Sequence, residues 1–158
     1  MRRKDREVTD LTQITSIMNQ CDSCRLGLVD NGIPYIVPLC FGYDVQNGQV
    51  TLYFHSAGEG RKLDIIQQNG TAAFEMDSAH VLFGQDGPSA CHFGMRFQSV
   101  MGNGTVRILE NTEEKLHAFD RIMAHYAESW PAYNPQYLEA ATIIAFTVES
   151  ISCKVNKA

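Results

Sequence analysis

Residues 53–64 read Tyr-Phe-His-Ser-Ala-Gly-Glu-Gly-Arg-Lys-Leu-Asp and give the strongest indication of the fold. They predict a strand, a glycine-containing loop and a helix that begins with the cations Arg61 and Lys62. Unpaired N–H groups and the helix dipole attract anions to a helix start, and glycines let the backbone approach them closely. Because basic residues normally favour the opposite helix end, this pattern indicates a phosphate site. The alternative is an exposed helix that happens to begin with two basic residues.

The composition of the 158 residues fits a single domain, residues 1–158. The formal net charge of -5 provides no global field that would attract nucleic acid or an anionic membrane. We expect neither a signal peptide nor a membrane span, because no apolar run has the required length. The five cysteines, an odd number, predict reduced thiols and a cytoplasmic protein.

Cys21 and Cys24 have the spacing of redox dithiols and of zinc sites. They fall where a predicted helix ends and a strand begins, whereas a thioredoxin-type pair follows a strand at a helix start. Free cysteine is among the most frequently buried residue types. We therefore expect buried thiols and no metal site, with a thiol or metal module as the alternative.

The rest of the sequence predicts about six strands joined mostly by hairpins, with three helices between them. Asp10 with Gln13, and Asn111 with Glu114, are typical caps of two of these helices. This order predicts a mainly β (α+β) protein with an antiparallel barrel rather than a doubly wound sheet. The strands are expected at residues 24–29, 33–43, 49–55, 71–77, 95–109 and 142–154, with a loop-rich stretch at 78–94.

Three segments resemble the pyridoxamine-phosphate-oxidase-like flavin-binding split barrels in order and spacing. They are Pro-Tyr-Ile-Val-Pro-Leu at 34–39, the run at 53–64, and Ser-Val-Met-Gly-Asn-Gly at 99–104. Within that group the chain is most similar to the nitroimidazole-resistance (Nim) proteins, over most of its length. The resemblance implies an antiparallel FMN-binding split β-barrel with about three peripheral helices.

The resemblance also implies which residues bind the flavin. Arg61 and Lys62 would hold its phosphate, and the main chain at Val37, Pro38 and Leu39 would meet the polar edge of its isoalloxazine ring. Pro38 independently suits an edge strand, because proline has no N–H to donate. The other implied contacts are Gly60 in the phosphate loop, His55 and Ser56 beside the ring and ribityl chain, and Ser99, usually from a second subunit.

Two departures from the oxidases limit these expectations. The C-terminal Trp…Arg-Leu-x-Pro element that contacts their substrate has no counterpart here, so vitamin B6 oxidation is not expected. Ser99 and Met101 replace a glutamine and an arginine of the partner strand, which leaves FAD open as an alternative to FMN.

The implied function is a flavin-dependent oxidoreductase that passes electrons from NADH or NADPH to a small acceptor, such as a 5-nitroimidazole-type nitroaromatic ring. The nicotinamide would dock transiently, because no Gly-x-Gly-x-x-Gly follows a predicted strand. His55 is the catalytic candidate, since an imidazole titrates near neutrality and donates protons. A histidine fixed in the barrel wall is the alternative for this residue. A flavin-binding carrier, sensor or scavenger without turnover is the alternative function.

Residues 33–43 are largely apolar on both faces of their predicted strand. A lone barrel would leave one of these faces in water. We therefore expect a homodimer with flavin at the interface, and a covering helix of the same chain is the alternative.

Overall fold

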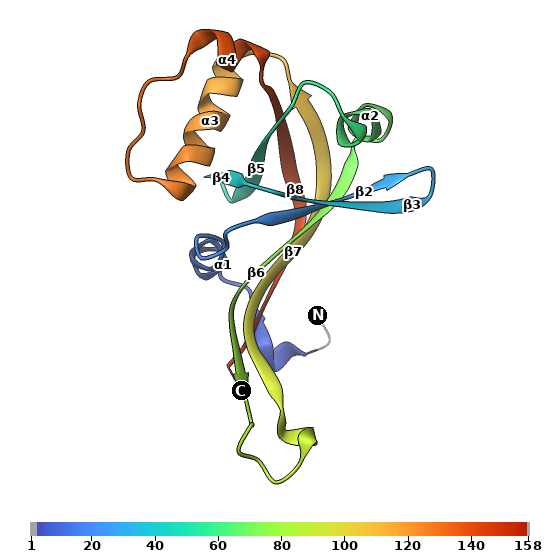
Figure 1. The fold of residues 1–158 in the computed structure, drawn as a ribbon, viewed down its shortest axis with the longest axis vertical. Coiled ribbons are helices and arrows are strands. Elements are labelled where there is room, and N and C mark those ends of the chain that lie inside the picture. The colour runs from blue at the N-terminus through green and yellow to red at the C-terminus, as the bar shows by residue number, and fades with distance from the viewer. Residues whose placement is uncertain (1–2, 158) are drawn as a thin grey trace.

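The structure is a computed structural model that describes residues 3–157. In this part of the chain, eight strands form one sheet and four α-helices pack around it (Figure 1). The hydrogen-bonded order is β3-β2-β6-β7-β8-β5-β4, β1 joins β8, and all pairs are antiparallel. The strands are β1 (Glu7–Val8), β2 (Cys24–Asp30), β3 (Ile33–Leu39), β4 (Phe41–Gln46), β5 (Gln49–Ser56), β6 (Thr71–Phe83), β7 (Gly94–Leu109) and β8 (Thr142–Asn156). The helices are α1 (Leu11–Met18), α2 (Arg61–Gln68), α3 (Thr112–Tyr126) and α4 (Pro135–Ala140), with short 3-10 helices at Lys4–Arg6 and Ala90–His92.

The two edge strands of the sheet, β3 and β4, are consecutive in the chain and joined only through Cys40. The inner faces of the sheet therefore share one apolar core, to which α1 and α2 also contribute. This arrangement confirms the predicted split barrel, and the short α4 adds to the three expected helices. Large, fully buried members of the core are Met18, Leu26, Phe41, Leu52, Phe54, Met76, Val100 and Phe146.

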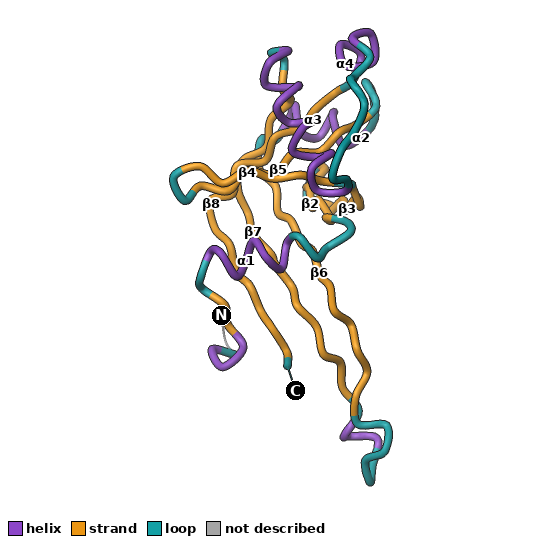
Figure 2. The backbone as a smooth tube through the Cα atoms, turned by 90° about the vertical axis from the view of Figure 1, so that its left-hand side faces the viewer, coloured by secondary structure: helices purple, strands orange, loops and turns teal. Residues whose placement is uncertain are grey.

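The strand expected at 33–43 divides at Cys40, so that β3 pairs with β2 and β4 pairs with β5. The loop expected at 78–94 is shorter than predicted, because β6 continues to Phe83 and β7 begins at Gly94. These strands form a long hairpin that projects from the barrel (Figure 2). A β-bulge lies between Ser78 and Val81, where Ala79 has a φ of 57°. The bulge breaks the alternation on which strand prediction depends.

The helix starts follow local capping rules. The Asp10 side chain accepts a hydrogen bond from Gln13 N, and Asn111 accepts from Glu113 N and Glu114 N. Both expected caps are thus confirmed. No helix within residues 3–157 is both long and apolar enough to cross a membrane.

Helix α3 packs closely on β4 at Gly42. A Cβ placed on Gly42 would meet backbone atoms of Arg121 and Ile122 at distances below van der Waals contact. Glycine is therefore required at this position by the approach of α3, which then buries Ala118 and Ile122.

Candidate functional site

The strand, loop and helix expected at 53–64 are present, with β5 ending at Ser56 and α2 beginning at Arg61. Gly60 adopts a φ of 139°, a conformation that side-chain-bearing residues rarely adopt. Leu63 N and Asp64 N donate to Gly60 O, so the first hydrogen bonds of α2 begin there. Gly60 has no side chain with which to cap the helix. The first-turn N–H groups of α2 are therefore oriented to receive an anion.

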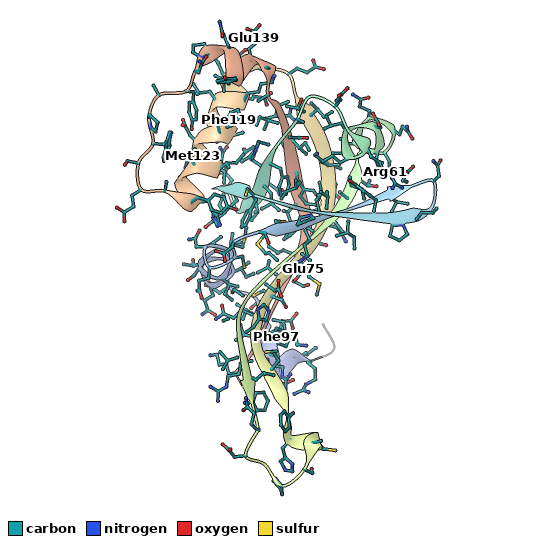
Figure 3. All side chains as sticks on the ribbon, in the orientation of Figure 1. Arg61, Glu75, Phe97, Phe119, Met123 and Glu139 are labelled. Carbon is teal, nitrogen blue, oxygen red and sulfur yellow. The ribbon has the colours of Figure 1, made fainter. Side chains whose placement is uncertain are left out.

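Arg61 links the start of α2 to the β2–β3 hairpin. Its Nε and Nη2 both lie 2.9 Å from Oδ2 of Asp30, and its guanidinium carbon lies 4.8 Å from the centre of the Tyr35 ring. The side chain remains 54% exposed. Figure 3 shows Arg61 beside α2 and the β2–β3 hairpin. Asp30 thus orients Arg61 without burying it. Sequence reasoning missed this carboxylate, because a hairpin residue carries no local signal of a partner 31 positions away.

Lys62 follows Arg61 in the same first turn of α2. Within residues 3–157 its side chain has no hydrogen-bonding or ion-pair partner, in contrast to Arg61. The site therefore combines one oriented guanidinium with one uncompensated ammonium group, and both favour a phosphate ligand.

His55 and Ser56 lie on opposite faces of β5, as the predicted alternation requires. His55 is exposed, whereas Ser56 faces the core side and is only 7% exposed. The Ser56 hydroxyl is buried and has no hydrogen-bonding partner among the described residues. Such a group is uncommon in folded proteins, and it fits a site that accepts a polar ligand. The two neighbours cannot present their side chains to the same surface.

Strand β3 supplies the next part of the site. Val37 and Leu39 are half-buried against the core, while Pro38 is exposed on the outer face opposite Arg25. Among the described strands none pairs with the free edge of β3, which confirms the edge position inferred from Pro38. An edge strand presents backbone N–H and C=O groups without a ladder partner. The contact of Arg61 with Tyr35 brings this edge strand close to the start of α2.

Ser99 lies apart from these residues. It is a nearly buried residue of β7, opposite Asp77 of β6 and Lys154 of β8. Strands β2 and β6 separate it from β3, a distance of three strand spacings or about 14 Å. The structure therefore brings α2 and β3 together within one subunit but does not bring Ser99 to them.

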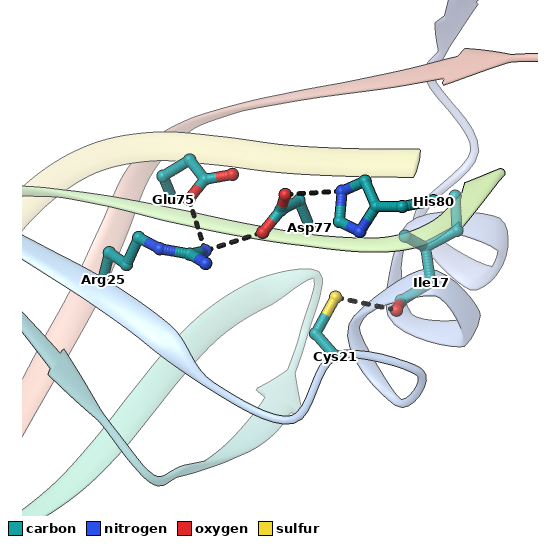
Figure 4. Close-up of polar contacts among 6 residues, drawn as sticks. All are labelled: Ile17, Cys21, Arg25, Glu75, Asp77 and His80. Atoms are coloured by element: carbon teal, nitrogen blue, oxygen red, sulfur yellow. Dashed lines mark hydrogen bonds and ion pairs between the residues drawn. The ribbon is translucent and has the colours of Figure 1, made fainter. Parts of the chain in front are cut away.

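A charged network that the sequence did not indicate joins Arg25 of β2 to Glu75 and Asp77 of β6 (Figure 4). Arg25 Nη1 donates to Glu75 Oε2 at 2.9 Å and to Asp77 Oδ1 at 2.6 Å. Nε2 of His80 lies 2.7 Å from Oδ2 of Asp77. The hydrogen bond to Asp77 raises the pKa of the Arg25 guanidinium. The network depends on the pairing of β2 with β6, so no short motif could have revealed it.

All five cysteines are free thiols, and Cys21 and Cys24 are buried. Burial raises the pKa of Cys21 to about 11 and that of Cys24 further. Cys21 Sγ donates to Ile17 O at 3.3 Å (Figure 4). Within residues 3–157 no three His, Cys, Asp or Glu side chains gather as metal ligands would. The Cys-x-x-Cys pair thus has the environment of core thiols rather than of reactive ones.

The family model for pyridoxamine 5'-phosphate oxidase matches residues 10–155. A solved structure of a candidate 5-nitroimidazole antibiotic resistance protein from Bacteroides thetaiotaomicron is 34% identical, with a TM-score of 0.81. The match covers 94% of this chain and 86% of that one. None of the curated proteins compared with the sequence matches it.

Two further solved structures share the fold at lower identity. The flavocytochrome Anf3 from Azotobacter vinelandii is 18% identical, with a TM-score of 0.79, and the match covers 100% of this chain and 72% of that one. An FAD-binding protein from Mesorhizobium loti is 19% identical, with a TM-score of 0.65 and coverage of 94% and 96%. Identities this low show likeness of fold alone.

Proposed function

Because the chain belongs to the pyridoxamine 5'-phosphate oxidase family, we propose that it is a flavin-binding oxidoreductase. Its acceptor would be a small nitroaromatic compound of the 5-nitroimidazole type, and its electron donor NADH or NADPH. The observation that carries the proposal is the start of α2, where Arg61 is oriented by Asp30 and Lys62 is uncompensated. The similarity to the Bacteroides protein supports the choice of acceptor.

The residues present at this site fit a flavin phosphate. The helix start offers N–H groups, Arg61 offers the guanidinium donors that Asp30 leaves unused, and the Ser56 hydroxyl lacks a hydrogen-bonding partner among the described residues. The free edge of β3, the strand that carries Val37, Pro38 and Leu39, offers main-chain groups to the polar edge of a flavin ring. The bound flavin would supply the electron transfer, while the protein binds and orients. FMN is our first choice, and FAD the second, because some proteins of similar fold are named for FAD.

His55 is the proposed proton donor to the acceptor. Its imidazole is exposed at the end of β5 and has no partner within the described chain, so it is free to meet a substrate. Its position next to Ser56 and the loop keeps it within a few residues of the proposed phosphate site. A general acid must reach the group that it protonates, and the exposure of the imidazole supports this role.

We further propose a cytoplasmic homodimer with two flavin sites at its interface. Ile33 and Ile36 of β3 are 63% and 66% exposed, an unusual exposure for large apolar side chains on one edge strand. Ser99 lies three strands away from β3 within one subunit, and the resemblance to the split barrels favours its supply by the partner subunit. Light scattering should report twice 17.7 kDa. A particle of 17.7 kDa at micromolar concentration would contradict the dimer.

The decisive experiment is an absorption spectrum of the purified protein, with the released cofactor identified by mass. We expect a flavin spectrum that NADH or NADPH bleaches without oxygen and that a 5-nitroimidazole then restores. A colourless protein that takes up neither FMN nor FAD would overturn the proposal. A yellow protein that no nicotinamide bleaches would instead be a flavin carrier, sensor or scavenger.

A further inference from the structure

A cavity lies between α3, α4 and the loop that joins them, remote in sequence from the α2 site. Its volume is about 410 Å³, within the range of about 300–1,000 Å³ typical of small-molecule sites. Phe119 and Met123 on α3 form one wall (Figure 3). Its other large side chains are Trp130, Tyr133, Tyr137 and Leu138. The walls are thus mainly aromatic.

Two of the aromatic side chains, Phe119 and Tyr133, are held in place. The rings of Phe119 and Tyr133 lie 5.6 Å apart between centroids and are tilted by 41°. The Tyr133 hydroxyl donates to Oδ1 of Asp120 at 3.0 Å, which fixes the orientation of this ring. Tyr137 on α4 also lines the cavity and is 77% exposed, so its ring is open to a ligand. Offset and edge-to-face contacts with such rings favour a planar aromatic ligand.

The charges around the cavity select among aromatic ligands. Asp120 on α3, Glu128 in the loop and Glu139 on α4 are acidic. Two basic residues oppose them: Arg121 lines a different cavity together with Thr15 and Asn19, and Lys115 on α3 donates to the Glu139 backbone carbonyl at 3.4 Å, which leaves the carboxylates in excess. The surroundings therefore disfavour anions and favour neutral or positively charged molecules.

We propose that this cavity binds a small, planar aromatic molecule that is neutral or positively charged. The site is separate from the proposed flavin site, and the inference does not depend on flavin binding. Aromatic stacking supplies the affinity, and the acidic surroundings supply the discrimination against anions.

Trp130 makes the inference directly testable, because it is the only tryptophan of the chain and lines the cavity. The purified protein is titrated with 1-naphthylmethylammonium, 1-naphthol and 1-naphthalenesulfonate, while Trp130 emission is followed with excitation at the red edge of its absorption band. We expect saturable quenching by the cation and by the neutral compound. The sulfonate should bind about tenfold more weakly, which corresponds to a loss of about 1.4 kcal/mol in binding free energy.

Two variants and a matched control locate the binding. Tyr137→Ala removes an exposed ring and should lower the affinity for the cation by about two- to tenfold. Asp120→Asn keeps an oxygen acceptor for Tyr133 but removes the charge. It should lower the affinity for the cation by about two- to fivefold and leave the affinity for the neutral compound unchanged. Glu149→Gln removes an exposed carboxylate of β8 and should change neither affinity.

Three results would overturn the proposal. They are an absence of saturable quenching, equal binding of the sulfonate and the cation, and an unchanged affinity in Tyr137→Ala. A shift of Trp130 emission on diluting the protein alone would show that a second copy covers the cavity, which would also refute a small-molecule site. Because the titration reads Trp130 and not flavin, a colourless protein can still confirm this inference.

Discussion

Replacing Arg61 and Lys62 together by alanine should weaken FMN binding by about a hundredfold or more. A charge-assisted hydrogen bond contributes about 1.5–3 kcal/mol. We use the lower end of this range because Arg61 is 54% exposed and already paired with Asp30. Two such losses amount to about 3 kcal/mol, which corresponds to slightly more than a hundredfold in affinity.

The same substitutions should leave folding stability nearly unchanged. An exposed ion pair such as that of Arg61 with Asp30 contributes about 0–1 kcal/mol to stability, and Lys62 makes none within the described chain. Arg107→Ala is the matched control. Arg107 is 59% exposed and pairs with Glu114 of α3, so it has the exposure and pairing of Arg61 without its position at α2.

The assay is a titration of apoprotein followed by the quenching of flavin fluorescence, with FMN and with riboflavin, which lacks the phosphate. The double variant should lose affinity for FMN and keep its affinity for riboflavin, whereas Arg107→Ala should change neither. An unchanged FMN affinity would refute the phosphate assignment. An equal loss for both flavins would show that the two cations act elsewhere than on the phosphate.

Three further predictions concern catalysis, the thiols and packing. His55→Ala should lower nitroaromatic turnover by about a hundredfold or more with unchanged flavin content and melting temperature, and wild-type turnover would exclude a catalytic role. Ellman's reagent should modify only the exposed Cys40 and Cys91 in the native protein, and all five cysteines after denaturation. Because burial raises the pKa of Cys21 from 9.0 to about 11, its contribution to stability is full below pH 9.0 and is lost as the pH rises toward about 11. Gly42→Ala should destabilise the fold by about 1–3 kcal/mol in urea unfolding, whereas Gly58→Ala, at an open position, should change little.

Sequence reasoning succeeded where neighbouring residues decide the structure. The caps at Asp10 and Asn111 and the start of α2 after Gly60 depend on interactions within one helical turn. It failed to divide residues 33–43 at Cys40, because both halves are equally apolar and only their different partners, β2 and β5, distinguish them. Helix α4 was missed for another reason. An Asn-Pro pair is typical of a turn, but here Asn134 caps α4 and Pro135 is its first residue.

In the candidate site, too, local features were predicted and long-range contacts were not. The sequence predicted both phosphate-binding candidates, Arg61 and Lys62, at one helix start. It predicted neither the pairing of Arg61 with Asp30 nor the network of Arg25 with Glu75 and Asp77. Those contacts join residues between 31 and 52 positions apart. They depend on strand register, which a single sequence specifies only through the complete fold.

The start of α2 violates several local rules of stability at one place. Cations at a helix N-terminus oppose the helix dipole by about 0.3–1 kcal/mol each. Gly60 adopts a φ of 139°, which a residue with a side chain would adopt only with strain. The unpartnered Ser56 hydroxyl adds the cost of a buried, unsatisfied polar group, about 1–3 kcal/mol. A bound phosphate would offset the charge of Arg61 and Lys62 and supply hydrogen-bond acceptors to the same helix start. Local instability that one ligand can offset supports a binding site, and for this reason the functional proposal rests on the start of α2 rather than on the barrel around it.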